Sequence, residues 1–216
     1  MRVARAFAVA ALLFVAAAPV VAEDDAEAVR RVFSAYRAAI LAGKGDAAAA
    51  LLSRSTYAYY DEMRQLALRG DAASVQSQSL VNQMQVLMLR LRVPLGQLES
   101  LAPRELIAYA VDQGWIGKQS VLKLQPGKVH AEGDVAVLDV IIDAQEAGPA
   151  FSFNRESGAW RLDLVPTTQL GNAALELAAR QQGIPESEFM LVLVESVLGR
   201  KVGAEAWVPP QGRPTR

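Results

Sequence analysis

Four short apolar segments within Ser120–Val165 constrain the fold most, because turn-forming residues separate them and apolar and polar residues alternate along them. The clearest segment is Val135–Asp143, in which alternate residues form one apolar face, as in a strand that is buried on one side only. That face carries Ala136, Leu138, Val140 and Ile142. The preceding Glu132-Gly133-Asp134 suits a tight hairpin, since Asp and Gly tolerate a left-handed backbone. We predict an antiparallel four-stranded β-meander.

The neighbouring segments extend this meander on both sides. They are Val121–Gln125, which Lys128–Ala131 resumes as the same strand, the pair Phe151 and Phe153, and Ala159–Val165. Pro126-Gly127 has turn chemistry, and Gln145–Pro149 is expected to be a loose connection. The aromatic side chains Phe151, Phe153 and Trp160 fall on the apolar face. The other face carries Lys123, Asp139, Arg161 and Asp163, which we interpret as cross-strand ion pairs in solvent; the alternative is an Asp139 buried under a helix.

A sheet with one apolar face needs a cover, and both flanks of the meander have helical patterns. Asp25–Ala42 repeats apolar residues at helical spacing and ends at Gly43, a residue suited to a left-handed cap. Asp46 is expected to cap an alanine-rich helix that reaches Leu52, and Glu62–Arg69 to form a short third helix. The predicted fold class is α+β and helix-rich overall.

The remaining segments are also read as helical, apart from the C-terminal end. Asp71 is expected to cap a long helix with the apolar stripe Leu80, Met84, Leu87, Met88 and Leu91, whose Gln and Ser residues face outward. Pro103–Gln113 is a further predicted helix. Two more follow the sheet, one capped by Thr167 or Thr168 and running to about Gln182, the other spanning Glu186–Leu198. We divide the chain into residues 1–22, a single α+β domain at 23–202 with a helical insertion at 71–114 and a C-terminal helical pair at 167–199, and a flexible Pro-containing tail at 203–216.

Met1–Ala22 has the form of a secretory signal peptide. Arg2 and Arg5 precede an apolar run that ends before Pro19 and is shorter than the roughly 18 apolar residues of a spanning helix. We predict a bacterial periplasmic or secreted protein that is soluble after signal cleavage and has no later membrane span. An uncleaved leader that stays as a membrane anchor is the alternative.

Composition excludes several classes of function. The chain has 22 Lys and Arg against 23 Asp and Glu, so its charge recommends no nucleic-acid partner. It has no cysteine, which excludes disulfides, thiolate catalysis and cysteine-based metal sites. His130 is the only histidine and is interpreted as a sheet-edge residue, with proton transfer as the alternative. We predict no metal site and no cofactor.

The order of these segments resembles the nuclear transport factor 2-like, or ketosteroid-isomerase-like, superfamily. The resemblance rests on a first helix that ends in Gly-Lys-Gly-Asp (residues 43–46), an alanine-rich second helix, Tyr59-Tyr60-Asp61 and a meander that closes on Trp160-Arg161-Leu162. It implies a curved sheet that wraps around helices as a cone with an internal pocket. Members commonly have a short hairpin where this chain has Asp71–Gly114, and the two helices after Pro166 are additional. The superfamily includes enzymes, ligand binders and assembly modules, so the resemblance does not choose among them.

Two sets of candidate site residues follow. In ketosteroid-isomerase-like enzymes a tyrosine donates to an oxyanion and an aspartate removes a proton, which makes Tyr57, Tyr60 and Asp61 weak catalytic candidates, although their spacing matches no catalytic motif. The alternative is that both tyrosines pack the helices against the sheet and that Asp61 caps a helix. The candidate ligand-binding residues are Tyr36, Trp115, Phe151, Phe153 and Trp160, as the lining of an apolar cavity.

Our leading hypothesis is an exported, non-enzymatic domain that binds a small apolar ligand or a partner protein of the cell envelope. One alternative is an isomerase- or dehydratase-like enzyme with an Asp/Tyr site in the cone. The other is an assembly module that forms homodimers through its sheet. A cavity of roughly 300 Å³ or more with converging polar groups would discriminate among them.

Overall fold

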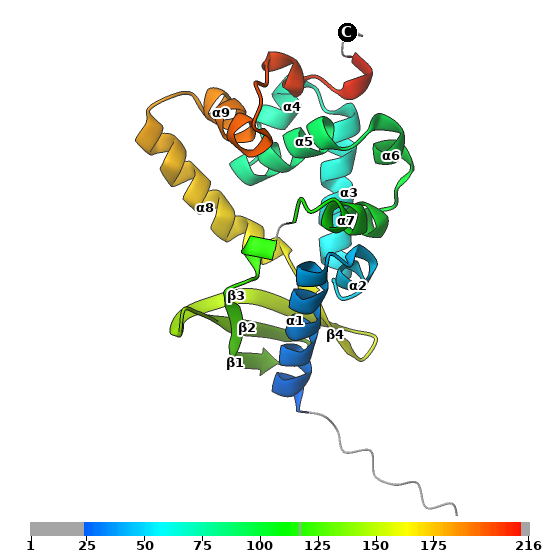
Figure 1. Ribbon diagram of the computed structural model, residues 1–216, viewed down its shortest axis with the longest axis vertical. Coiled ribbons are helices and arrows are strands. Elements are labelled where there is room, and N and C mark those ends of the chain that lie inside the picture. Colours follow the sequence, from blue (N-terminus) through cyan, green and yellow to red (C-terminus); the bar gives the residue numbers. More distant parts are fainter. Residues whose placement is uncertain (1–23, 117, 213–216) are drawn as a thin grey trace, which may run out of the picture.

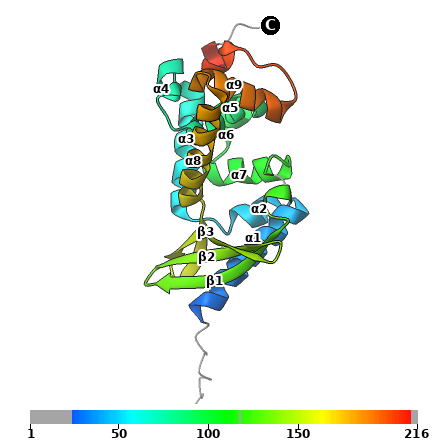
Figure 2. The same ribbon diagram turned by 90° about the vertical axis from the view of Figure 1, so that its left-hand side faces the viewer.

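The computed structural model describes residues 24–116 and 118–212, and it places a sheet with one helix below a larger group of helices (Figures 1 and 2). The α-helices are α1 (Asp25–Ala42), α2 (Gly45–Ala49), α3 (Arg54–Arg69), α4 (Ala72–Gln76), α5 (Leu80–Arg92), α6 (Leu95–Ser100), α7 (Pro103–Asp112), α8 (Val165–Gln182) and α9 (Glu186–Leu198). Short 3₁₀ helices span Lys118–Ser120, Ala204–Trp207 and Pro210–Gly212. The α+β fold is confirmed.

The sheet is an antiparallel meander, as predicted, with strand order β1-β2-β3-β4. Its strands are β1 (Leu124–Glu132), β2 (Val135–Ile142), β3 (Gln145–Glu156) and β4 (Ala159–Asp163). Two predicted connections are wrong. Pro126-Gly127 lies inside β1, where the register shifts between Pro126 and Val129, because an edge strand tolerates the missing proline N–H. Gln145–Pro149 belongs to β3, since it completes the pairing with the end of β2.

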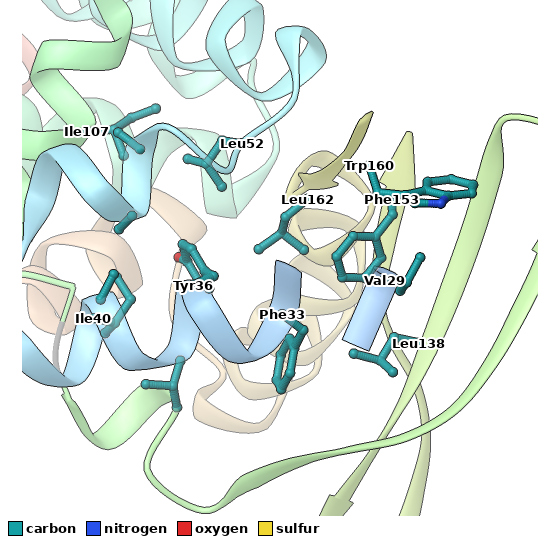
Figure 3. Packing of buried hydrophobic residues seen from close by; sticks show 14 of the residues in the cluster. Val29, Phe33, Tyr36, Ile40, Leu52, Ile107, Leu138, Phe153, Trp160 and Leu162 are labelled. Carbon is teal, nitrogen blue, oxygen red and sulfur yellow. The ribbon is translucent and has the colours of Figure 1, made fainter. Parts of the chain in front are cut away.

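The apolar face of the sheet packs against α1 (Figure 3). Leu138, Phe153 and Leu162 are fully buried there, and the Phe33 ring on α1 lies 5.1 Å from that of Phe151. Ile142 was expected on the same buried face but is 36% exposed. It is the last residue of β2, beside a tight turn at Asp143 and Ala144, both with positive φ, and the chain reverses there.

The N-terminal end of α1 is tied to the sheet by Asp25. Its carboxylate accepts a hydrogen bond from Trp160 Nε1 at 3.2 Å and pairs with Arg155, whose guanidinium also lies over the Trp160 ring. The hydrogen bond from Arg155, followed by that from Trp160, lowers the pKa of Asp25 below its ordinary 3.8.

This lowered pKa predicts an acid-dependent loss of stability. The contribution of Asp25 is fully present above pH 3.8 and is lost as the pH falls through the lower pKa of the folded state. The difference in melting temperature between the wild type and Asp25→Asn should therefore shrink below pH 3.8. Asp46→Asn, at an exposed position on α2, is the control and should show no such trend. A constant difference between wild type and Asp25→Asn across the acid range would refute the role of this carboxylate.

The connection between α2 and α3 joins the helices to β4. Leu52 pairs with Leu162 in a parallel bridge, and Ser53 N donates to Leu162 O at 2.9 Å. Asp163, which was predicted on the solvated face, is buried. Its carboxylate accepts hydrogen bonds from the Thr56 hydroxyl, the Asn154 amide and Val165 N. The last of these bonds starts α8 at Val165, earlier than the predicted cap at Thr167 or Thr168.

Several predicted helix boundaries differ because side chains from elsewhere complete the caps. α3 is one continuous helix capped by Ser53, so Asp61 lies inside it and caps nothing. Asp46 does not cap α2; instead Asp112 accepts a hydrogen bond from Gly45 N at 2.7 Å. α6 was not predicted.

The long helix that was expected to follow Asp71 is two helices. Asp71 caps only α4, and Ser79 caps α5. The Gln83 side chain donates to the carbonyl oxygens of Gln76 and Gln78 in the intervening turn and is buried, so the expectation that the glutamines face outward is wrong for Gln83. The break is therefore stabilised by hydrogen bonds that a helical pattern does not show.

The segment predicted as a flexible tail is packed over residues 203–212. Ala206 and Trp207 are buried in the second hydrophobic cluster, together with Met63, Leu87 and Met190. The physical reason is the Trp207 side chain, whose burial stabilises the short 3₁₀ turn that carries it. Residues 213–216 lie outside the described residues.

The predicted signal peptide also lies outside the described residues, which begin at residue 24. Among the helices of the described chain, none combines enough length with enough apolar character to cross a bilayer.

Candidate functional site

An apolar pocket of about 250 Å³ lies between α5, α7 and the chain that follows α7. It is a little smaller than the roughly 300–1,000 Å³ of typical small-molecule sites. Its lining residues are Tyr60, Met84, Gln85, Met88, Leu89, Arg92, Leu106, Ile107, Ala110, Trp115, Ile116 and Val197. The pocket lies among the helices, so it is not the cone cavity that the resemblance implied.

The walls of this pocket follow from local sequence. Met84 and Met88 are four residues apart on α5 and therefore share one face of the helix. Gly114, with φ 70°, reverses the chain after α7, and Trp115 N then donates to Ala110 O at 2.9 Å. The Trp115 ring thereby packs edge-on against Tyr109, with ring centroids 5.3 Å apart, and closes one side of the pocket.

Three polar side chains line the pocket without a hydrogen-bond or ion-pair partner in the described chain: the Tyr60 hydroxyl, the Gln85 amide and the Arg92 guanidinium. The neighbouring Tyr59, by contrast, donates to Asn82 at 2.9 Å. None of their polar atoms is among the fully buried atoms of the described chain that lack a partner, so each keeps accessible surface and can hydrogen-bond to a molecule in the pocket. These three groups are therefore available to a bound molecule.

Arg92 is the only charged residue among the described residues that line the pocket. Its guanidinium carbon lies 5.5 Å from the centroid of the Trp115 ring, a cation–π contact, and the side chain is half-buried. Burial lowers the pKa of Arg92, but a guanidinium stays protonated in proteins. The pocket thus has a permanent positive charge on an otherwise apolar wall.

Tyr60 keeps some accessible surface, and that surface is part of the pocket wall. Burial of the rest of the side chain raises the pKa of its phenol. The hydroxyl is therefore protonated at neutral pH and can donate one hydrogen bond to a ligand.

The structure places the five candidate ligand-binding residues in two different environments. Trp115 lines the pocket. Tyr36, Phe153 and Trp160 are buried in the core between α1 and the sheet, and Phe151 packs at the edge of that core. The structure does not bring these four residues together with Trp115.

The three candidate catalytic residues do not converge either. The Tyr57 hydroxyl donates to the carbonyl oxygen of Ala49, which holds the tyrosine as a packing residue, as the alternative interpretation expected. Asp61 pairs with Arg64 at 2.8 Å and does not line the apolar pocket. Tyr60 alone lines it.

The sequence prediction missed Gln85 and Arg92. Met84 and Met88 were included in the apolar stripe of the helix predicted after Asp71, but neither Gln85 nor Arg92 was singled out. The spacing of Gln85 and Arg92 could have indicated that they lie near the same surface, because residues seven apart share a helix face, here with Met88.

The other face of the sheet carries exposed ion pairs. Lys123 pairs with Asp143 at 2.9 Å and Lys128 with Glu146 at 3.3 Å, and His130 Nε2 lies 3.5 Å from Asp139 Oδ2. The Asp139 side chain is 19% exposed, so it is neither fully solvated nor sealed under a helix. Over residues 24–116 and 118–212, no three His, Asp or Glu side chains are grouped so as to hold a metal ion.

Comparisons with protein-family models, with curated proteins and with solved structures find no match for this chain. The resemblance to the nuclear transport factor 2-like superfamily stays a prediction from sequence.

Proposed function

We propose that this chain is an exported, non-enzymatic binding protein for a small apolar ligand, held in the pocket between α5 and α7. The supporting observation is the combination of an apolar wall with three polar groups that have no hydrogen-bond or ion-pair partner among the described residues. Binding sites for small molecules commonly have this composition, with few polar groups that fix orientation. Export is supported by the form of Met1–Ala22.

An isomerase- or dehydratase-like activity receives less support. Such chemistry needs a general base close to the ligand. The described residues of the pocket lining include no carboxylate and no imidazole, and Asp61 pairs with Arg64 outside the pocket. Homodimer formation through the sheet also receives less support than ligand binding, because the ion pairs of the outer sheet face are already formed within one chain.

Filling the pocket should weaken the binding of a neutral apolar probe. 1-Octanol should raise the melting temperature of the wild type, because a ligand that binds only the folded state stabilises that state. Ala110→Phe should weaken the binding of 1-octanol at least about tenfold, because the added ring occupies the cavity. Val197→Phe, at the half-exposed rim on α9, should weaken it as well while disturbing the packing less. Affinity is measured by isothermal titration calorimetry, and folding by circular dichroism.

Ala58→Phe is the matched control, since Ala58 is exposed on α3 and does not line the pocket. This variant should bind octanol like the wild type. Equal octanol affinity in folded Ala110→Phe, Val197→Phe and wild type, or no binding by the wild type of either octanol or its carboxylate counterpart octanoate, would refute the proposed function.

A further inference from the structure

We propose that the ligand of this pocket is an aliphatic carboxylate of medium chain length, with its head group on Arg92 and its tail along Met88. The inference rests on the proposed function and deepens it by naming the class of ligand. It is drawn from the charge, the unpaired groups and the dimensions of the pocket.

The positive charge of the pocket comes from Arg92. Arg92 is half-buried and lines the pocket, and no carboxylate of the described chain neutralises it. Its contact with the Trp115 ring stabilises the cation but provides no hydrogen-bond acceptor for the guanidinium N–H groups. A half-buried guanidinium without an anionic partner favours an anion from outside.

The guanidinium of Arg92 determines which shape of anion fits the pocket. A guanidinium presents two parallel N–H donors, which match the two oxygens of a carboxylate. The Tyr60 hydroxyl adds a further donor in the same pocket. A carboxylate can accept all of these hydrogen bonds, whereas an alcohol accepts fewer and an amine would be repelled by Arg92.

The size of the pocket limits the length of the ligand. Gln85 and Arg92 are seven residues apart on α5, which is about 10.5 Å along the helix axis. The wall beyond Arg92 is formed by apolar side chains such as Met88 and Met84. The cavity of about 250 Å³ lies just below the usual range of small-molecule sites, which favours a short aliphatic ligand over a long lipid chain. We therefore take an eight-carbon chain, with its head at Arg92, as the probe of this class.

The test compares three ligands that share one tail: octanoate, 1-octanol and octylamine at neutral pH. We expect octanoate to bind the wild type about tenfold tighter than octanol, and octylamine to bind more weakly than octanol. In Arg92→Gln the ratio of octanoate to octanol affinity should fall to about one, and in Arg92→Lys it should be intermediate, because an ammonium retains the charge without the paired donors. Arg200→Gln, at an exposed position after α9, should keep the wild-type ratio.

The outcomes separate this inference from the proposed function. Tight binding of octanol without preference for octanoate, or an unchanged ratio in Arg92→Gln, would overturn the carboxylate assignment and leave the apolar pocket intact. Absence of binding by all three ligands would overturn both. A preference for octanoate that Ala110→Phe does not reduce would place the carboxylate elsewhere and overturn the inference.

Discussion

Replacing Arg90 with methionine should lower the free energy of unfolding by about 3–5 kcal/mol. Arg90 is only 4% exposed, and its guanidinium donates to carbonyl oxygens from two distant segments. Leu66, Ala67 and Gly70 lie at the end of α3, whereas Ala206 and Trp207 belong to the C-terminal segment. Methionine preserves most of the aliphatic stem but removes the hydrogen bonds that the guanidinium donates to these carbonyl oxygens, of which those of Ala67, Ala206 and Trp207 are made in buried surroundings.

Two further substitutions test whether the guanidinium hydrogen bonds of Arg90 cause this loss of stability. Arg90→Lys keeps the charge but has a single nitrogen, which cannot reach both segments, so it should recover only part of the loss. Arg200→Met changes an exposed arginine and should alter the unfolding free energy by less than about 0.5 kcal/mol. Urea denaturation measures all three variants. A loss of less than about 1 kcal/mol in Arg90→Met would show that the C-terminal segment does not depend on this arginine.

Gly45→Ala should destabilise the protein by about 2–3 kcal/mol. Gly45 is buried where α2 packs on α7, and a β-carbon there would overlap the backbone carbonyl of Ala108. It would also lie 2.6 Å from Asp112 Oδ1, which accepts the hydrogen bond from Gly45 N. A backbone carbonyl inside a helix cannot move away as a flexible side chain would, so the two helices must separate.

Gly96→Ala is the matched control for this substitution. Gly96 lies in α6, and nothing lies within 4 Å of the position of its β-carbon. Alanine there should stabilise the protein by up to about 1 kcal/mol, because it restricts the unfolded chain and favours the helix. The two substitutions should therefore change the free energy of unfolding, measured with denaturant, in opposite directions. A Gly45→Ala variant as stable as the wild type would contradict the close approach of α2 and α7.

The elements that the sequence predicted best are those encoded by local periodicity. α1 and α9 have the predicted bounds, because each combines a regular apolar pattern with a glycine at its end. The meander was predicted from alternation in Val135–Asp143 and from its turns. In each case, the residues that determine the element lie within it.

Features that depend on distant partners could not be predicted in this way. The break between α4 and α5 depends on how the Gln83 side chain folds back, and the packed C-terminal segment depends on Arg90 and Trp207. The pocket was missed for the same reason. Arg92 becomes part of a binding site only because the chain after α7 brings Trp115 beside it.

The candidate site was predicted only in part. Trp115 and Tyr60 were singled out for their chemistry, and both line the pocket. The aromatic residues of the sheet were expected to line a cavity, but α1 fills that space with side chains such as Phe33 (Figure 3). An aromatic pattern on a strand thus indicates burial without distinguishing a core from a cavity.

The most direct measurement is a crystal structure of the protein with octanoate brominated on its terminal carbon. Anomalous scattering locates the bromine without any assumption about the pose of the ligand. Our account predicts the bromine among the apolar side chains of α5 and α7, near Met84 or Leu106, with the carboxylate on Arg92. A bromine outside this pocket, or a carboxylate that does not contact Arg92, would contradict it.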